Sequence, residues 1–314
     1  MKHLFILNPA AGKRDQIGEF TQKIRTVCDR RGVPYEILVS RSAGDCTRIA
    51  AAAAASNEAL RLYACGGDGT LNEVVNGVAE FKNVAITHFP GGSGNDFIKI
   101  FSDPSAFSDL DRLLDGEEAQ FDLIRCQDKI YALNVCSVGL DARVGTEVAK
   151  YKRLPLVSGP GAYFLSVGAN LIKGLHAHYV IEIDGKVIDG HQTMICIANG
   201  RWYGGSFHPV PTAEPDDGLL DVLLVHKVSR LTIARALGKY KNGQFSEFPN
   251  LIEHFRCKRI VVHCDQKSEI NLDGELLVAK DVVFEAVPQS LRFFYPKGLT
   301  YSTANTTNMQ AITK

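Results

Sequence analysis

The stretch "ACGGDGTLNE", from Ala64 to Glu73, places three glycines within four positions. An apolar, strand-like run precedes it, and a helix-like run begins at about Leu71. Glycine inside a helix or strand costs roughly 0.5–1 kcal/mol relative to alanine, so such a cluster belongs to a turn. The stretch therefore predicts a tight turn from strand to helix. Whether the turn only redirects the chain or also approaches a ligand depends on its surroundings.

Strand-like and helix-like runs alternate on both sides of this turn. Helical spacing covers 16–31 and stops at Gly32, and an alanine-rich helix is expected over 45–55. Strands are expected at "HLFILN" (3–8), "YEILVS" (35–40), "LRLYAC" (60–65), "VAITHFP" (84–90) and "FDLIRC" (121–126). Strands separated by helices predict a parallel, doubly wound α/β sheet.

The pattern changes after about Cys126, where most runs are strand-like. The pairs Asp184-Gly185 and Asp273-Gly274 are hairpin signals, and helices are expected only near 162–173 and 230–241. We therefore predict two domains. Residues 1–125 form a nucleotide-binding α/β domain, rejoined by the C-terminal segment 296–314, and residues 126–295 form a mainly antiparallel, β-rich substrate domain.

Two further turns resemble the first in their position after a strand. They are "NPAAGK" (8–13) and "GGSGND" (91–96). Ligands of doubly wound sheets bind at the carboxyl ends of the strands, where backbone N–H groups and helix N-termini can face a phosphate. The hydroxyls of Thr70 and Ser93 can donate to such a phosphate, and Lys13 can pair with its charge. The turns match neither the P-loop pattern nor the dinucleotide-binding glycine pattern.

These motifs carry a family resemblance. "NPAAGK", "GGDGTLNEVVNG", "PGGSGNDF", "NVCSVGLDA", "PTAEPDDGLLDV" and "INLDGE" occur in the order seen in the diacylglycerol kinase catalytic family, which includes bacterial soluble lipid kinases, sphingosine kinases and ceramide kinases. "GGDGT" alone is shared with NAD kinases, whereas the last two motifs favour lipid kinases. The resemblance reaches to about Pro296 and implies a β-sandwich as second domain. One departure is Pro90-Gly91-Gly92-Ser93, where the family usually has P-L-G-T.

The resemblance implies a set of nucleotide contacts and an acid for magnesium. The implied ATP-binding residues are Asn8, Ser40, Gly67, Asp68, Gly69, Thr70, Asn72, Glu73 and Ser93. Among them Asp68 is placed to hold Mg²⁺ on the phosphates, although aspartate is also common as a simple turn cap. Asp96 and Asp122 are further polar residues expected in the same cleft.

Two later acidic motifs are candidates for the remaining chemistry. Asp273 and Glu275 flank Gly274, so they share one face of a strand or converge across a turn. The resemblance makes Glu275 the proton acceptor with Asp273 beside it; the alternative is an exposed hairpin. Asp217 resembles the family's structural Mg²⁺ site, completed by the backbone carbonyls of Glu214 and Leu219, because Mg²⁺ prefers oxygen ligands. The alternative there is a solvated acidic loop.

Composition limits the other classes of function. Thirty-five basic residues balance thirty-five acidic ones, so broad attraction to nucleic acid is not expected. No apolar run reaches the roughly 20 residues of a membrane span, and the first run meets Asn8-Pro9 too early for a secretory signal, which favours the cytoplasm. The scattered cysteines are expected to be buried, reduced thiols. Strand alternation argues against a zinc site at His263 and Cys264, since it points them to opposite faces.

The sequence thus predicts a cytoplasmic lipid kinase that uses ATP and Mg²⁺, most simply on diacylglycerol. Its lipid substrate would be reached by transient association with the inner membrane face, through the basic and apolar segment 147–164; a solvated loop followed by a core helix is an equal alternative there. A homodimer is compatible with the sequence. The rival functions are an NAD kinase and a non-catalytic nucleotide-binding protein.

Overall fold

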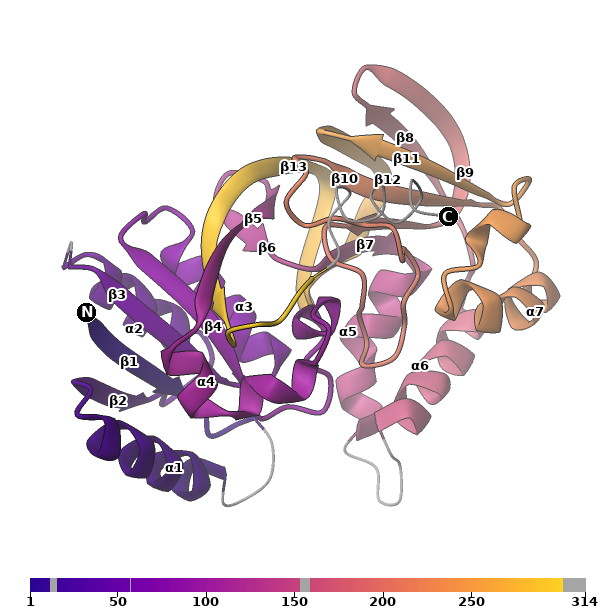
Figure 1. Cartoon of the computed structure of the whole chain (residues 1–314). Coiled ribbons are helices and arrows are strands. Elements are labelled where there is room, and N and C mark those ends of the chain that lie inside the picture. Colours follow the sequence, from indigo (N-terminus) through magenta and orange to yellow (C-terminus); the bar gives the residue numbers. More distant parts are fainter. Residues whose placement is uncertain (12–15, 57, 153–158, 302–314) are drawn as a thin grey trace, which may run out of the picture. The chain divides into compact units, whose positions relative to one another are not determined.

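A computed structural model describes residues 1–11, 16–56, 58–152 and 159–301 of the chain (Figure 1). The chain divides into two compact units. Unit 1 contains residues 1–122 together with the chain from 288 onward, and unit 2 contains residues 123–287. One long strand, β13 (Glu275–Tyr295), belongs to both, because it begins in unit 2 and ends in unit 1.

Unit 1 is built on the parallel sheet that the alternating pattern predicts. Its strands pair in the order β2-β1-β3-β4 and have the bounds β1 Lys2–Leu7, β2 Tyr35–Val39, β3 Leu60–Gly66 and β4 Val84–Pro90. The end of β13 extends this sheet, since Phe293 pairs in parallel with Ile86 of β4. The intervening helices are α1 Gln16–Arg31, α2 Asp45–Ala54 and α3 Asp68–Val78. The predicted α/β class is confirmed.

The helices of unit 1 pack closely because small residues face one another. A Cβ atom on Gly77 of α3 would lie 2.6 Å from the Thr47 carbonyl oxygen and 2.7 Å from Ala50 Cβ, both on α2. The two helices could not approach this closely with a larger residue at 77. Alanine in the middle of α2 therefore serves packing as well as helix propensity.

Short helices and a strand complete unit 1. They are η1 Phe97–Ile100, η2 Pro104–Ser108, α4 Leu110–Leu114 and β5 Glu117–Cys126. Phe97, Phe121 and Phe293 pack edge to face, with ring centroids 5.3–5.4 Å apart where Phe97 meets the other two. This aromatic cluster joins the end of β13 to the middle of the chain.

Unit 2 is a set of antiparallel strands. Their bounds are β6 Ile130–Ala132, β7 Val135–Gly139, β8 Ala177–Ile183, β9 Lys186–Ala198, β10 Leu220–His226, β11 Ile252–Cys257 and β12 Arg259–Leu272, followed by β13. Asp184-Gly185 and Asp273-Gly274 form the predicted tight hairpins, with positive φ at both residues of each pair. All eight cysteines of the chain are buried and free, as predicted.

The described part of unit 2 contains four helices. α6 (Gly159–Lys173) and α7 (Arg230–Lys241) lie where helices are predicted, and a short helix η3 (Phe245–Glu247) follows α7. α5 (Leu140–Lys152) is not predicted from the sequence, although Leu140 and Val144 show the i, i+4 spacing of a buried face. The segment expected at a membrane, 147–164, includes 153–158, which lie outside the described residues.

β13 passes from one unit to the other at Pro288. The next residue, Gln289, has φ +49°, and its N–H donates to a carboxylate oxygen of Asp122 at 2.7 Å. Asp122 is fully buried in β5, so it acts here as an internal acceptor for the bent strand. Its expected place in a ligand cleft stays a prediction.

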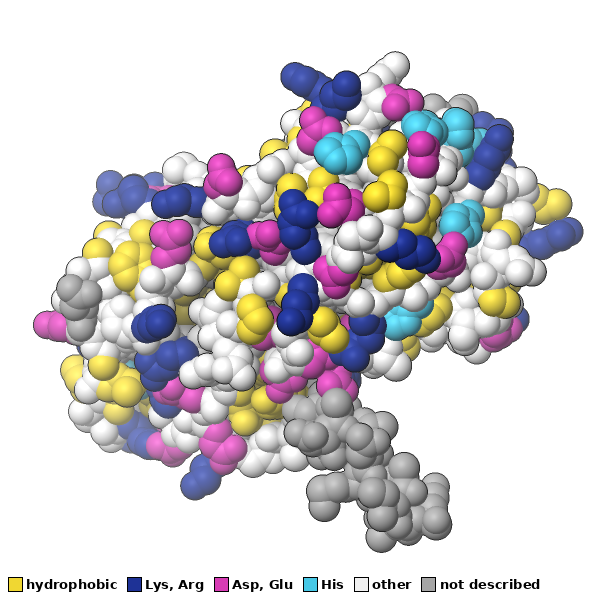
Figure 2. All heavy atoms as spheres, turned by 90° about the horizontal axis from the view of Figure 1, so that it is seen from above, with side chains coloured by type: hydrophobic (Ala, Val, Ile, Leu, Met, Phe, Trp, Pro, Cys, Tyr) yellow, Lys and Arg dark blue, Asp and Glu magenta, His cyan; other side chains and the backbone are white. Residues whose placement is uncertain are grey.

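No helix among the described residues is long and apolar enough to cross a bilayer. On the face shown in Figure 2, Lys and Arg side chains are interspersed with Asp and Glu side chains. This agrees with the zero formal net charge of the sequence.

Candidate active site

The glycine turn at 66–70 and the glycine turn at 91–96 of unit 1 lie against each other. The Gly91 N–H donates to the Gly66 carbonyl oxygen at 2.7 Å, which continues the pairing of β3 and β4 into the turns. A Cβ atom on Gly92 would lie 2.6 Å from Gly67 Cα. Glycine at position 92 is thus required by a backbone-to-backbone contact, whatever ligand the turns also bind, whereas a Cβ atom on Gly67 would be tight, at 3.3 Å from Gly92 Cα.

Asp68 joins the same two turns through its side chain. One carboxylate oxygen accepts the Asn95 N–H at 2.8 Å and the other accepts the Asp96 N–H at 2.5 Å. Asp68 begins α3 and is half-buried. It therefore binds backbone N–H groups of a distant turn, which goes beyond the simple turn cap that the sequence allows. The prediction that it faces Mg²⁺ is a separate one and stays a prediction.

Asn8 and Thr70 link the turn that begins at Asn8 to the glycine turn at 66–70. Asn8 Nδ2 donates to Thr70 Oγ1 at 3.1 Å, and Asn8 Oδ1 accepts the Ala10 N–H at 3.0 Å. Thr70 is buried, whereas Gly69 and Ser93 are exposed. Lys13, expected to pair with phosphate, lies outside the described residues.

Ser40, Asn72 and Glu73 lie around the start of α2 and the first turns of α3. Glu73 Oε2 accepts the Cys46 N–H at 3.0 Å, so it caps α2 from the neighbouring helix. Ser40 is buried, its N–H donates to the Leu7 carbonyl oxygen at 2.9 Å, and its side chain contacts Cys46. Asn72 accepts from Asn76 Nδ2 at 3.2 Å. Their expected contacts with ATP stay predictions.

A histidine that the sequence analysis passed over lies beneath the first glycine turn. His88 of β4 is fully buried, and its Nε2 is 2.9 Å from the Gly66 carbonyl oxygen. Burial lowers the pKa of His88, and this outweighs the raising effects of Asp68 and of the Gly66 carbonyl. A neutral imidazole that donates from Nε2 fits this position. Its only sequence signal is a histidine inside an apolar run.

In unit 2, the Asp273 carboxylate accepts hydrogen bonds from three consecutive backbone amides. They belong to Leu133 at 2.6 Å, Asn134 at 3.1 Å and Val135 at 2.7 Å, all in buried residues between β6 and β7. Asp273 lies in the turn, at φ +52°, and Glu275 begins β13 with an exposed side chain. Of the two sequence alternatives, the turn is therefore the one found.

The acidic turn, defined as residues 214–219, contains the residues expected to bind structural Mg²⁺. Asp217 Oδ1 accepts the Leu219 N–H at 2.9 Å, and Asp217 Oδ2 forms an ion pair with the guanidinium of Arg256 on β11. Burial raises the pKa of Asp217, and Arg256 opposes this shift. Among the described residues, no group of three or more His, Cys, Asp or Glu side chains is arranged to hold a metal ion.

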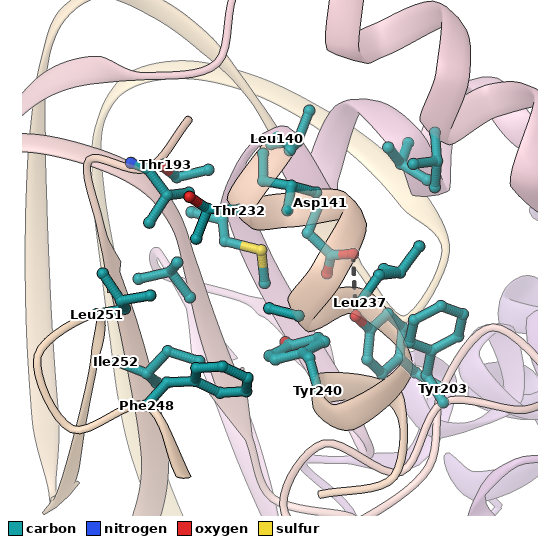
Figure 3. A pocket seen from close by; sticks show the side chains of 18 residues that line it. Leu140, Asp141, Thr193, Tyr203, Thr232, Leu237, Tyr240, Phe248, Leu251 and Ile252 are labelled. Carbon is teal, nitrogen blue, oxygen red and sulfur yellow. Dashed lines mark hydrogen bonds between the residues drawn. The ribbon is translucent and has the colours of Figure 1, made fainter. Parts of the chain in front are cut away.

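An apolar cavity of about 80 Å³ in unit 2 was not predicted (Figure 3). Residues of α5, α6, β9, β10 and α7 and of the segment 248–252 line it, among them Val144, Val167, Met194, Val225, Leu237 and Phe248. Some of the lining residues carry polar groups: Asp141 is 5% exposed, and Tyr203 Oη donates to its Oδ1 at 2.9 Å. The lining comes from scattered positions, so only the apolar spacing of 232–240 could have indicated part of it.

Two family models and several known proteins match this chain. Residues 2–126 match the Diacylglycerol kinase catalytic domain, and residues 134–295 match the YegS C-terminal NAD kinase beta sandwich-like domain. The chain is 28% identical over 282 residues to the "Putative lipid kinase SH2167" of Staphylococcus haemolyticus (strain JCSC1435), with 88% of this chain and 89% of that protein covered.

Solved structures show the same fold. The chain is similar to a "putative diacylglycerol kinase" from Bacillus anthracis str. Sterne, with TM-score 0.73, 23% identity and coverage of 94% of this chain and 95% of that one. It is also similar to an NAD kinase from Archaeoglobus fulgidus solved in complex with ATP, with TM-score 0.53, 14% identity and coverage of 95% and 94%. At these identities the likeness shows the fold alone, including the β-sandwich expected for the second domain.

Proposed function

Since the chain belongs to the family that combines a diacylglycerol kinase catalytic domain with a YegS C-terminal domain, we propose that it is an ATP-dependent lipid kinase. It transfers the γ-phosphoryl group of ATP to a lipid hydroxyl, and diacylglycerol is the proposed acceptor, which becomes phosphatidic acid. The observation that carries the lipid assignment is the apolar cavity of unit 2 with its buried Asp141.

The cavity suits the end of an acyl chain better than a polar acceptor. Each buried methylene contributes roughly 0.8 kcal/mol, so even a short length of chain adds useful affinity. The cavity of about 80 Å³ is smaller than the 150 Å³ or so that holds a benzene molecule in other proteins. A full acyl chain therefore requires α7 to move outward. α7 is suited to this movement because Tyr240 is the only buried residue of this fully described helix.

The Asp141–Tyr203 pair at the cavity wall suits the lipid head. Tyr203 gives its single hydroxyl proton to Asp141, so the carboxylate and the phenol oxygen can each accept a hydrogen bond from a glycerol hydroxyl. Because the carboxylate is 5% exposed in apolar surroundings, a hydroxyl that bonds to it gains more than it would in water. We propose that this pair orients the acceptor.

The nucleotide is proposed to bind at the glycine turns of unit 1. Exposed Gly69 and Ser93 stand on two turns that contact each other, with Asn8 and Thr70 bonded behind the first. Magnesium enters with the triphosphate as MgATP, and Asp68 is the acid proposed to face it. The turns supply the positioning and charge stabilisation on which phosphoryl transfer depends.

The proton of the acceptor hydroxyl is proposed to pass to Glu275. The hydroxyl oxygen bonds to the γ-phosphorus, the bond from that phosphorus to the bridging oxygen of ADP breaks, and the carboxylate takes the proton. Glu275 is exposed, and so it is accessible to an acceptor. Such assistance typically contributes 10²–10⁴-fold to the rate.

The test is a set of parallel reactions of the full chain with γ-labelled ATP. Each reaction contains one acceptor: diacylglycerol, sphingosine or ceramide in mixed micelles, or NAD in solution. We expect label in phosphatidic acid, and Asp141→Asn should raise KM for the lipid more than for ATP. Label in NAD alone would establish the NAD kinase alternative. ATP binding without label in any acceptor would favour the non-catalytic one.

A further inference from the structure

The acidic turn of unit 2 is the place where the family resemblance implies a structural Mg²⁺. The donor set expected for that ion is the Asp217 carboxylate with the carbonyl oxygens of Glu214 and Leu219. Mg²⁺ requires oxygen ligands in nearly ideal octahedral geometry, and it gives up its water shell reluctantly. Whether the turn fits such an ion depends on what its carboxylates already contact.

Both oxygens of Asp217 face donor groups of the protein. The Leu219 N–H points to Oδ1 at 2.9 Å, and the Arg256 guanidinium pairs with Oδ2. A divalent ion at this carboxylate would have to displace the guanidinium, because two cations cannot share one oxygen at contact distance without strong repulsion. The carboxylate is thus already neutralised from within the chain.

Arg256 reaches the turn because the sheet places it there. In the antiparallel pairing of β10 and β11, Asp221 lies directly opposite Arg256, and Arg256 Nε is 3.9 Å from Asp221 Oδ1. His254, two residues earlier on the same face of β11, contacts Asp221 Oδ1 through Nε2 at 2.6 Å. The strand register therefore places Arg256 and His254 beside Asp221 of β10, and from there Arg256 reaches Asp217 of the acidic turn.

A second arginine approaches from the loop that leads into the turn. Arg201 Nε donates to the Ala213 carbonyl oxygen at 2.6 Å, directly before the turn begins. Burial lowers the pKa of Arg201, and the charges of Glu214, Asp216 and Asp221 oppose that shift. The acidic turn thus has a guanidinium on each flank.

The loop that carries Arg201 also contacts Asn134, one of the residues whose backbone N–H binds Asp273. Asn134 Nδ2 donates to the Trp202 carbonyl oxygen, and the Asn134 N–H donates to Asp273. The acidic turn is therefore bonded, through this loop, to the residues that hold the Asp273 carboxylate.

We infer that Arg256, and not a divalent metal ion, holds the acidic turn in place in this chain. The residues present do not fit the family's structural Mg²⁺. Arg256 is accordingly a positioning residue for the turn and for the loop 199–213. This inference concerns the cation at the turn, so it does not depend on which lipid or other acceptor the protein phosphorylates.

The test compares thermal melting of the full chain, without nucleotide, in EDTA and in excess MgCl₂. We expect the same Tm for the wild type in both. Arg256→Gln should lower the Tm of unit 2 in both by about 2–4 °C, which corresponds to a loss of about 1 kcal/mol in a cooperative unit of that size. Arg256→Lys keeps the charge and should recover most of that loss, which separates an ionic role from simple packing.

A direct metal measurement completes the design. Mn²⁺ serves as a spin-active probe for Mg²⁺, titrated into the wild type and Asp217→Asn and followed by electron spin resonance. Equal Mn²⁺ binding by the two proteins supports the inference. Saturable Mn²⁺ binding that Asp217→Asn abolishes would overturn it, as would a wild-type Tm that rises with Mg²⁺ and falls with EDTA, or an Arg256→Gln protein that melts like the wild type. The melting comparison decides the matter even if Asp217→Asn does not fold.

Discussion

Asp68 of unit 1 and Asp273 of unit 2 both bind backbone N–H groups through their carboxylates. The residues two positions after them differ in exposure. Each carboxylate accepts backbone N–H groups from a distant part of its own unit: Asn95 and Asp96 for Asp68, and residues 133–135 for Asp273. Beside Asp273, however, Glu275 is exposed, whereas Thr70 beside Asp68 is buried.

The comparison distinguishes two roles for a carboxylate: one fixes the backbone of a turn, and the other is available to a substrate. A carboxylate that accepts two or three amides is fixed, and its loss leaves buried donors without partners. An exposed carboxylate next to such a turn is positioned by it and still available to a substrate. Unit 2 therefore has a clamp, Asp273, and the proposed base, Glu275, two positions apart, whereas in unit 1 the clamp and the proposed ligand contact are the same residue, Asp68.

The largest expected effect is that of Glu275→Gln on turnover. The substitution keeps the shape and removes the basicity, so the rate should fall by about 10²–10⁴-fold, while Tm and ATP affinity barely change. Single-turnover kinetics with labelled ATP measure it. Near-normal turnover would remove Glu275 from the mechanism and break the distinction between clamp and base.

Asp273→Ala should be the largest effect on stability. Three buried amides lose their common acceptor, and each unsatisfied donor costs about 1–3 kcal/mol, so we expect a loss of about 3 kcal/mol or more in the free energy of unfolding. Urea denaturation followed by far-ultraviolet circular dichroism measures it. If the variant melts normally and only turnover is lost, Asp273 acts in catalysis and not as a clamp.

Gly92→Ala tests the contact between the two glycine turns. The new Cβ atom would lie 2.6 Å from Gly67 Cα, and overpacking of this kind costs about 1–3 kcal/mol. Gly18→Ala is the matched control, because a Cβ atom there meets nothing within 4 Å. Calorimetry of both variants should show destabilisation at 92 and none at 18. An equally stable Gly92→Ala protein would mean that the turns can separate without cost.

Asp68→Asn should destabilise the protein less than Asp273→Ala or Gly92→Ala, by about 1 kcal/mol. The amide keeps one oxygen acceptor for one of the two N–H groups and places a donor against the other. Comparing Tm with the KM for ATP sharpens the contrast between the units. A fall in Tm with an unchanged KM would make Asp68 a clamp only, like Asp273; an unchanged Tm with a raised KM would make it a ligand contact only.

The sequence predicts most of unit 1 because its signals are local. α1 has the predicted bounds, and the strands of the parallel sheet lie within a few residues of the predicted runs. The contact of Gly67 with Gly92 could not be predicted, because it depends on how two separate turns meet in space. The amide partners of Asp68 and Asp273 were missed for the same reason.

Unit 2 was predicted less completely because its site is assembled from distant segments. The cavity draws side chains from helices and strands between 140 and 252, and α5, which supplies Asp141, was not predicted. The segment containing α5 mixes glycine with charged residues, and that mixture resembles a surface loop. Arg256 has no signal before the register of β10 and β11 is known.

The shared strand β13 has a consequence for synthesis on the ribosome. β4 pairs with β3 on one side, and it receives its second neighbour, β13, only when Phe293 has been made, roughly 200 residues after β4 itself. At about 5–20 residues per second, this is a delay on the order of 10–40 s. During that time the nascent N-terminal half carries an unpaired parallel edge at β4, and Phe97 and Phe121 lack their contacts with Phe293. Chaperone dependence of the nascent chain should therefore end once the segment that contains Phe293 has left the ribosome.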